Sequence, residues 1–191
     1  LSVFTTERLR SRAMDTTKQR LENKVSVVIG GSTGFGKATV ELFSEHGARV
    51  IVVGRRKDLA EQVAQEFGGK GFACDVVEDG QVKNLVDSVL ETEGAIDVVV
   101  NYAGYQESRR IRELTPEHVR PMVEVQLIGA LQVIQHFGNA MASNGGGSII
   151  STSSLTAHNP STGHPVYAAC KSGLEYLTEI AALDMSLIKI S

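Results

Sequence analysis

A glycine-rich turn between an apolar run and a helical pattern is the feature that most constrains this chain. Residues 25–29 are mostly β-branched, which predicts a short strand buried on both faces. They lead into Gly30-Gly31-Ser32-Thr33-Gly34-Phe35-Gly36, and a helical pattern follows to about His46. Glycines let the backbone approach a pyrophosphate, and the helix N-terminus adds free N–H groups and a positive dipole end. Glycines also serve ordinary turns, but their place between a strand and a helix favours a phosphate site.

Strand and helix patterns alternate along the remainder of the chain. Four more strands are predicted over residues 49–53, 71–76, 96–100 and 148–151. Further helices are predicted over residues 57–67, 79–92, 116–142 and 164–185. The order predicts an α/β fold with one doubly wound parallel sheet, a three-layer α/β/α Rossmann fold. Residues 23–191 are expected to form this single domain, and the polar residues 1–22 a flexible N-terminal arm.

Two arginines follow the second predicted strand. Dinucleotide folds that select NAD usually place an acid there, where it binds the ribose 2′-hydroxyl. Here the strand is followed by Gly54, Arg55 and Arg56. A guanidinium group can bind a 2′-phosphate in a bidentate manner, so the pair predicts that NADP(H) is preferred over NAD(H). The alternative is that both arginines are simply solvated at the start of the next helix.

The ends of the third and fourth predicted strands also suit a flat ligand. In open parallel sheets, ligands bind outside the carboxyl ends of the strands. The third strand ends in Asp75 and Val76. The fourth is followed by Asn101, Tyr102, Ala103 and Gly104. The small residues among these leave room for a ring or a ribose to lie against the strand end.

Tyr167 and Lys171 form the one pair that suggests acid–base chemistry. Residues four apart on a helix lie on the same face, one turn from each other. An ammonium group held near a phenol favours the phenolate, so such a pair can exchange a proton with an alcohol or ketone oxygen. A solvated lysine beside a half-buried tyrosine would have the same spacing, and the pair therefore gains its meaning from the rest of the chain.

The composition argues against several kinds of partner and binding site. The net charge of −3 gives no reason to expect nucleic acid or an anionic membrane as the main partner. No apolar run reaches transmembrane length. The five histidines show no ligand spacing, so no metal site is expected. The two cysteines, Cys74 and Cys170, lie far apart in sequence and favour a reducing compartment, which we expect to be the cytoplasm.

In this order and spacing, the motifs resemble those of the short-chain dehydrogenase/reductase family, over about residues 22–185. The glycine turn matches the family's own, Asp75-Val76 its adenine-contacting pair, and residues 101–104 its Asn-Asn-Ala-Gly motif with Tyr102 in place of the second Asn. Ser154, thirteen residues before Tyr167, matches its catalytic serine, and Tyr167 and Lys171 match its Tyr-x-x-x-Lys.

The resemblance implies hydride transfer between a nicotinamide and a small carbonyl or secondary alcohol substrate. Tyr167 would exchange the proton with the substrate oxygen, Lys171 would assist it and hold the nicotinamide ribose, and Ser154 would stabilise the substrate oxygen. The implied catalytic residues are Ser154, Tyr167, Lys171 and Gln126. The implied cofactor-binding residues are Gly30, Ser32, Thr33, Gly34, Phe35, Gly36, Arg55, Arg56, Asp75, Val76, Asn101, Ala103, Gly104, Tyr167 and Lys171.

The chain departs from the family pattern at three places. Ile29 stands where the family usually has Thr, with the expected loss of one local hydrogen bond. Gln126 stands at the family's fourth catalytic position, an Asn, and its extra methylene is expected to impair or rearrange the proton relay. The chain ends at Ser191, whereas family members run to roughly 250 residues, the upper size of one such domain. We therefore expect the substrate loop and last strands to be missing and residues 188–190 to begin a sixth strand.

The resemblance also predicts that copies of the chain associate. In many relatives the subunits pair through the helices that match residues 116–142 and 164–185, so a homodimer or homotetramer is expected.

The alternative to an active enzyme is a catalytically impaired nucleotide-binding or interaction protein that keeps the fold. Gln126 and the early end of the chain favour this alternative, whereas the presence of Ser154, Tyr167 and Lys171 opposes it.

Overall fold

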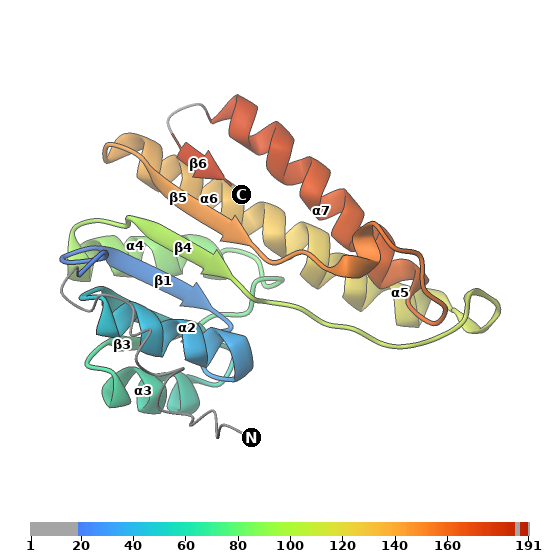
Figure 1. Cartoon of the computed structure of the whole chain (residues 1–191), viewed down its shortest axis with the longest axis horizontal. Helices are drawn as coiled ribbons and strands as arrows, with labels where there is room; N and C mark the ends of the chain where they lie inside the picture. The colour runs from blue at the N-terminus through green and yellow to red at the C-terminus, as the bar shows by residue number, and fades with distance from the viewer. Residues whose placement is uncertain (1–18, 186–187, 191) are drawn as a thin grey trace, which may run out of the picture.

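The computed structural model describes residues 19–185 and 188–190. Most of the predicted arm, residues 1–18, therefore lies outside the described residues. Within them, six strands form one parallel sheet in the order β3-β2-β1-β4-β5-β6 (Figure 1). The strands are β1 (Val25–Ile29), β2 (Arg49–Gly54), β3 (Lys70–Ala73), β4 (Val98–Asn101), β5 (Gly147–Ser151) and β6 (Ile188–Ile190).

Helices cover both faces of this sheet, as the doubly wound prediction requires. The helical segments are α2 (Gly34–Glu45), α3 (Lys57–Glu66), α4 (Gln81–Glu93), η1 (Ile111–Glu113), α5 (Pro116–Val123), η2 (Glu124–Gly129), α6 (Ala130–Ser143), η3 (Leu155–Ala157) and α7 (Pro165–Asp184). Residues of α2 and α3 pack in one hydrophobic cluster with β1 and β2, and those of α4, α6 and α7 pack in another. The predicted Rossmann fold is confirmed, including residues 188–190 as a sixth strand.

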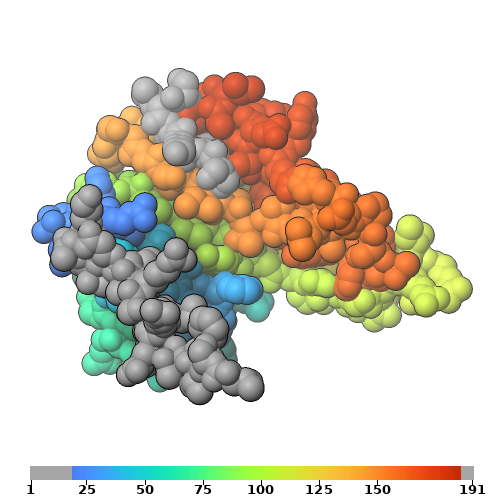
Figure 2. All heavy atoms as spheres, viewed as in Figure 1, coloured from blue at the N-terminus to red at the C-terminus, as the bar shows by residue number. Residues whose placement is uncertain are grey.

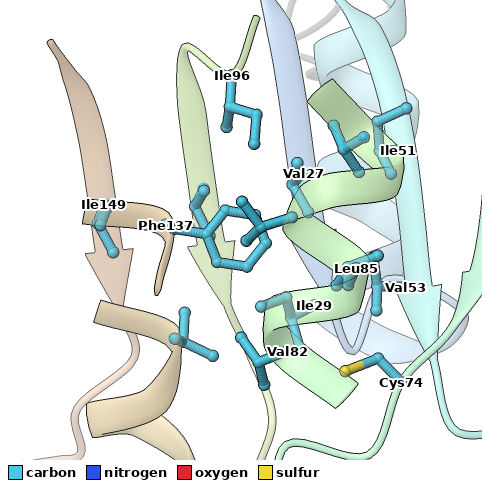
Figure 3. Packing of buried hydrophobic residues seen from close by; sticks show 14 of the residues in the cluster. Val27, Ile29, Ile51, Val53, Cys74, Val82, Leu85, Ile96, Phe137 and Ile149 are labelled. Atoms are coloured by element: carbon cyan, nitrogen blue, oxygen red, sulfur yellow. The ribbon is translucent and has the colours of Figure 1, made fainter. Parts of the chain in front are cut away.

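Phe137 of α6 is the largest fully buried side chain of the α4–α6 layer. It packs against Val27 and Ile29 of β1, with Val82 and Leu85 of α4 close by (Figure 3). Alternate residues of β1 therefore point to this layer, while Val28 points to the α2–α3 cluster on the other face. Burial on both faces is why β1 reads as a continuous apolar run.

The boundary predicted for the third strand is wrong. This strand was expected to reach Val76, but β3 ends at Ala73 because its partner β2 ends at Gly54, the last residue in register with it. The helix expected over residues 116–142 is present as the uninterrupted helical run α5-η2-α6, and the π-helical turn η2 lies inside it. Gly129, at the end of η2, is the point of close approach: a Cβ there would lie 2.6 Å from Cγ2 of Val76.

The segments after β4 and β5 are held together beyond the sheet. In Figure 2 the yellow-green residues after β4 and the orange residues after β5 lie together at one end of the molecule. The backbone N–H of Arg109 donates to the carbonyl of Gly163 at 2.8 Å, and the Gln106 amide nitrogen lies 2.8 Å from Nδ1 of His164. Among the described residues, no helix is both long enough and apolar enough to cross a membrane.

Candidate active site

A half-open cleft of about 1100 Å³ lies at the carboxyl ends of the central strands. Its walls include most residues that the sequence singled out: Gly30, Ser32, Thr33, Gly34, Phe35, Gly36, Arg55, Arg56, Asp75, Val76, Ala103, Gly104, Gln126, Tyr167 and Lys171. Asn101 and Ser154 are the two predicted site residues outside this wall. The fold thus brings together, in one cleft, motifs that are spread over about 140 residues of sequence.

The glycine turn forms a cradle that larger residues would fill. Gly30 has φ of +77°, and a Cβ there would lie 3.1 Å from Cβ of Tyr102. A Cβ on Gly36 would lie 2.1 Å from the Gly30 carbonyl oxygen, so the start of α2 needs glycine for packing. Thr33, the N-cap residue of α2, makes no side-chain cap hydrogen bond, which leaves the first amide groups of the helix available to an anion.

Arg55 and Arg56 lie on the cleft wall beside this turn, and both are exposed. No ion pair to either guanidinium occurs within residues 19–185. Gly54, the residue before Arg55, lies close to the turn, since a Cβ on Gly54 would be 2.9 Å from Oγ of Ser32. This end of the cleft therefore presents backbone donors and two cations, which suits phosphate groups.

The segment after β3, which the motifs predict to contact adenine, lies on the wall of the cleft. The Asp75 backbone N–H donates to Oε1 of Gln81 at 2.9 Å, and its carboxylate accepts from the Val77 N–H at 3.3 Å. Val76 is buried. Burial, together with the Asp75 charge, raises the pKa of the neighbouring Cys74 thiol to about 11. Cys74 is therefore a neutral packing residue here, because a thiol of that pKa has almost no thiolate at neutral pH.

Asn101 lies behind the cleft rather than on it. Its side chain is buried, and Oδ1 accepts from the Ala103 N–H at 3.0 Å. Its backbone carbonyl accepts from the Thr152 N–H and hydroxyl, both at 3.2 Å. Asn101 thus shapes the ends of β4 and β5, and a direct contact with a cofactor stays a prediction. Tyr102, which replaces the family's second Asn, places its hydroxyl 2.9 Å from Oγ1 of Thr39 on α2.

Tyr167 and Lys171 lie side by side on α7, as their spacing predicts. Nζ of Lys171 is 5.7 Å from the centroid of the Tyr167 ring. It donates to the Thr152 carbonyl at 2.6 Å, and the Lys171 residue is only 5% exposed. Burial lowers the pKa of Lys171 from its ordinary value, partly opposed by Cys170. The lysine is thus fixed at the end of β5 with its ammonium beside the tyrosine.

Ser154 begins the turn η3, just after Ser153 on the cleft wall. Its Oγ accepts hydrogen bonds from the Thr156 N–H at 3.3 Å and from the Thr156 hydroxyl at 3.0 Å. A serine hydroxyl has two acceptor lone pairs and one proton. With both lone pairs engaged, the Ser154 proton is left to donate to another oxygen.

Gln126, in the π-helical turn, is 2% exposed and faces the segment after β4. Its Nε2 donates to the Tyr105 carbonyl at 2.9 Å, and its Oε1 has no hydrogen-bond partner among the described residues. A Cβ on Gly104 would lie 3.3 Å from Nε2, so Gly104 gives this amide its space. A buried acceptor without a partner is costly, and the residue that carries it lies on the wall of the cleft.

Sequence reasoning missed two residues that organise the site. Thr152 supplies the carbonyl that holds Lys171, and Glu175 binds Ser153 on the cleft wall and His158 beyond it. A backbone carbonyl gives no sequence signal. Glu175 did have a sequence signal: it follows Lys171 by four residues and therefore lies on the same helix face as Tyr167 and Lys171.

Comparisons with known proteins agree with the fold. The family model described as short chain dehydrogenase matches residues 24–191. Mitochondrial borneol dehydrogenase of Lavandula x intermedia is 33% identical over 173 residues, which make up 89% of this chain and 66% of that protein. Tropinone reductase-like 1 of Erythroxylum coca is 35% identical over 162 residues, which make up 82% of this chain and 60% of that protein. The chain thus spans less than two thirds of the length of these relatives.

A solved structure agrees with this assignment at the level of the whole fold. The crystal structure of a gluconate 5-dehydrogenase from Burkholderia cenocepacia, in complex with NADP and tartrate, aligns with a TM-score of 0.87. The two proteins are 26% identical, and the alignment covers 93% of this chain and 72% of that one. On these matches, the chain belongs to the short-chain dehydrogenase family.

Proposed function

We propose that this chain is the cofactor-binding and catalytic part of an NADP(H)-dependent oxidoreductase that moves a hydride between a nicotinamide and a carbonyl or secondary alcohol. The observation that carries the proposal is the position of Tyr167 and Lys171. They share one cleft with the glycine turn and with Arg55. A phosphate-binding end and an acid–base end in the same cleft are what such a reaction requires.

The cofactor would lie along the carboxyl ends of the strands. The open N-terminus of α2 and the glycine cradle would hold the pyrophosphate. Asp75 and Val76 would contact the adenine, and Ala103 and Gly104 would leave room for the ribose. When bound, the nicotinamide would supply or accept the hydride.

Tyr167, Lys171 and Ser154 would handle the substrate oxygen. In carbonyl reduction the Tyr167 hydroxyl donates its proton to the oxygen as the carbonyl carbon gains the hydride; in oxidation the proton returns to Tyr167. Lys171 stabilises the phenolate that remains, and it is already anchored to Thr152. Ser154 donates its free hydroxyl proton to the same oxygen, which stabilises the charge that develops there.

The preference for NADP(H) rests on the exposed Arg55 and Arg56, neither of which is engaged by a carboxylate within the part of the chain that the structure describes. Their guanidinium groups are free to bind a 2′-phosphate. The gluconate 5-dehydrogenase with a similar fold has NADP in its complex, which is consistent with this choice. The substrate is proposed only as a small carbonyl or alcohol, and the cytoplasmic location stays a prediction.

The rival function is nucleotide binding without turnover, and the hydrogen bonding of Gln126 favours it. Its amide is tied to the Tyr105 carbonyl, so its Nε2 is not available to a proton relay in this arrangement. Against it, Tyr167 lies beside Lys171 on the cleft wall, which is the arrangement that proton transfer to a bound substrate needs. The two functions share the cofactor and differ in turnover.

We also propose that two copies pair through the helices of residues 116–142 and 164–185. Several large apolar side chains on these helices are exposed, and a cluster of such residues would suit an interface: Ile128, Leu131, Tyr176, Ile180 and Leu183. Helix α7, which carries the last three of these residues, packs against η2 and α6, which carry Ile128 and Leu131. Analytical ultracentrifugation of wild type and of Leu183→Glu would test the pairing, with a single monomeric species in both as the contradicting result.

The function is tested by titration and by turnover. Calorimetric titration with NADPH and NADH should show binding of both, tighter for NADPH. Oxidation of NADPH, followed by absorbance, should occur with at least one member of a panel of aldehydes and ketones and should vanish in Tyr167→Phe. Tight NADPH binding with no turnover across the panel would select the rival function instead.

A further inference from the structure

Glu175 lies on the same line of α7 as the acid–base pair. Tyr167, Lys171 and Glu175 are spaced by four residues, so each is one helical turn from the next. The Glu175 carboxylate is only 29% exposed and binds two partners with its two oxygens. Oε1 accepts a hydrogen bond from the Ser153 hydroxyl, and Oε2 lies 3.0 Å from Nε2 of His158.

These two partners stand on either side of the turn that carries Ser154. Ser153 directly precedes Ser154, and His158 is the C-cap residue of η3. One carboxylate therefore holds the turn at its beginning and at its end. A lone exposed ion pair would be a weak constraint, but here the same group also receives a hydroxyl from the cleft wall.

Other residues of α7 bind the same segment and make the attachment rigid. Nζ of Lys171 donates to the Thr152 carbonyl at 2.6 Å, and Oγ of Ser172 donates to the Ala157 carbonyl at 2.7 Å. The segment of residues 152–158 is thus held by α7 at four points, two of which are made by Glu175. The position of Ser154 relative to Tyr167 is consequently set through this helix.

We infer that Glu175 is a positioning residue for Ser154. Its carboxylate fixes the turn so that the free Ser154 proton points at the same substrate oxygen that Tyr167 protonates. The inference rests on the proposed function for its effect on rate. A donor must be held closely to be effective, since a misplacement of about 1 Å can cost about a hundredfold in rate. A carboxylate that only stabilised the fold would alter the melting temperature and leave the rate of the folded enzyme intact.

The test is a double-mutant cycle on NADPH oxidation with a carbonyl substrate. Glu175→Ala should lower kcat by roughly tenfold, a partial loss of that positioning effect, while the Kd for NADPH stays within about twofold. Glu175→Gln keeps an oxygen acceptor for Ser153 and should recover most of kcat. In a Ser154→Ala background, Glu175→Ala should have little further effect. Equal losses of kcat in the two backgrounds, or no loss in wild type, would overturn the inference.

A matched control is available one turn further along the helix. Glu179 is an exposed glutamate on α7, four residues after Glu175. Glu179→Ala removes the same charge from the same helix and should leave kcat unchanged. A loss of kcat in Glu179→Ala as large as in Glu175→Ala would show that the helix charge matters, and not the contact with the turn.

Hydrogen exchange separates failure of this inference from failure of the proposed function. The amides of Ala157 and His158 are bonded to the carbonyls of Ser154 and Leu155 within the turn. They should exchange faster in Glu175→Ala than in wild type or Glu179→Ala, whether or not the protein turns over. An inactive wild type would refute the proposed function alone, whereas unchanged exchange in Glu175→Ala would refute the role of Glu175 alone.

Discussion

Nζ of Lys171 donates a 2.6 Å hydrogen bond to the backbone carbonyl of Thr152, which joins the middle of α7 to the end of β5. The lysine is 5% exposed, so this bond forms away from solvent. It gives Lys171 one fixed position beside Tyr167, and it binds the turn that carries Ser154 to the same helix.

Lys171→Ala should impair both cofactor binding and turnover. The change removes the cation beside Tyr167 and also the donor that holds the Thr152 carbonyl. We expect NADPH affinity to fall by roughly tenfold, as for a lost charged hydrogen bond, and turnover to fall further. Calorimetric titration and single-turnover kinetics would measure the two effects. Unchanged NADPH affinity would show that Lys171 does not hold the cofactor.

Tyr167→Phe should abolish turnover and spare binding, because only the hydroxyl is lost. Removal of a general acid costs typically 10²–10⁴-fold in rate, so NADPH oxidation should fall by at least about a hundredfold. The Kd for NADPH should stay within about twofold of wild type. Tyr176→Phe is the matched control, since Tyr176 is an exposed tyrosine on the same helix. Normal turnover in Tyr167→Phe would place the acid elsewhere.

Arg55→Ala should erase most of the preference for NADPH over NADH. Loss of a charge-assisted contact to the 2′-phosphate should weaken NADPH binding by roughly tenfold to a hundredfold. NADH lacks this phosphate, and its affinity should change little. Lys57→Ala provides the control, because Lys57 is the next exposed cation and pairs at 3.6 Å with Glu61. Equal weakening for both cofactors would argue against 2′-phosphate recognition by Arg55.

Phe137→Ala should destabilise the fold strongly. Phe137 is fully buried in the cluster that joins the sheet to α4 and α6 (Figure 3). Truncation of a buried Phe typically costs about 3–5 kcal/mol through lost burial and the cavity that remains. Chemical denaturation would measure the loss. Phe35→Ala is the comparison, because Phe35 is 84% exposed and its loss should leave the free energy of unfolding nearly unchanged.

Asp97 should make stability depend on pH in the acid range. Its carboxylate accepts hydrogen bonds from Nζ of Lys24 at 2.7 Å and from the Val25 N–H at 2.9 Å. Partial burial alone would raise the pKa of Asp97, but these bonds and the charges of Lys24 and Arg49 outweigh it, so the pKa is lowered. The stability that Asp97 contributes is thus present above the unfolded pKa of about 3.9 and is lost as the pH falls through the lower folded pKa.

Asp97→Asn measures this contribution. The variant should melt at a lower temperature than wild type at pH 7, and the difference should shrink as the pH falls below about 4. Asp87→Asn is the control, because Asp87 forms an exposed pair with Lys83 on α4 and should show a smaller difference. A gap in melting temperature that stayed constant from pH 7 to pH 3 would contradict the role assigned to the Asp97 charge.

Much of the fold could be predicted because its signals are local. The β-branched run of β1 and the glycine turn after it lie within twelve residues, and they mark a buried parallel strand that leads into a helix. The spacing of Tyr167 and Lys171 placed both on one face of α7, where they are found. The prediction erred at β3, which ends with its partner at Gly54, and no sequence pattern indicated the π-helical turn at the place where Gly129 meets Val76.

The sequence by itself determined the class of fold, the glycine turn that we propose binds phosphate and the placing of Tyr167 and Lys171 on one helix face, because each is encoded by residues that are neighbours along the chain. Only the tertiary structure decided how the site is held together. Gln126 binds the Tyr105 carbonyl across 21 positions, Glu175 binds Ser153 across 22, and Lys171 binds the Thr152 carbonyl across 19. Such contacts depend on how a helix lies against the end of a strand, which the packing of the whole sheet sets and no local pattern records.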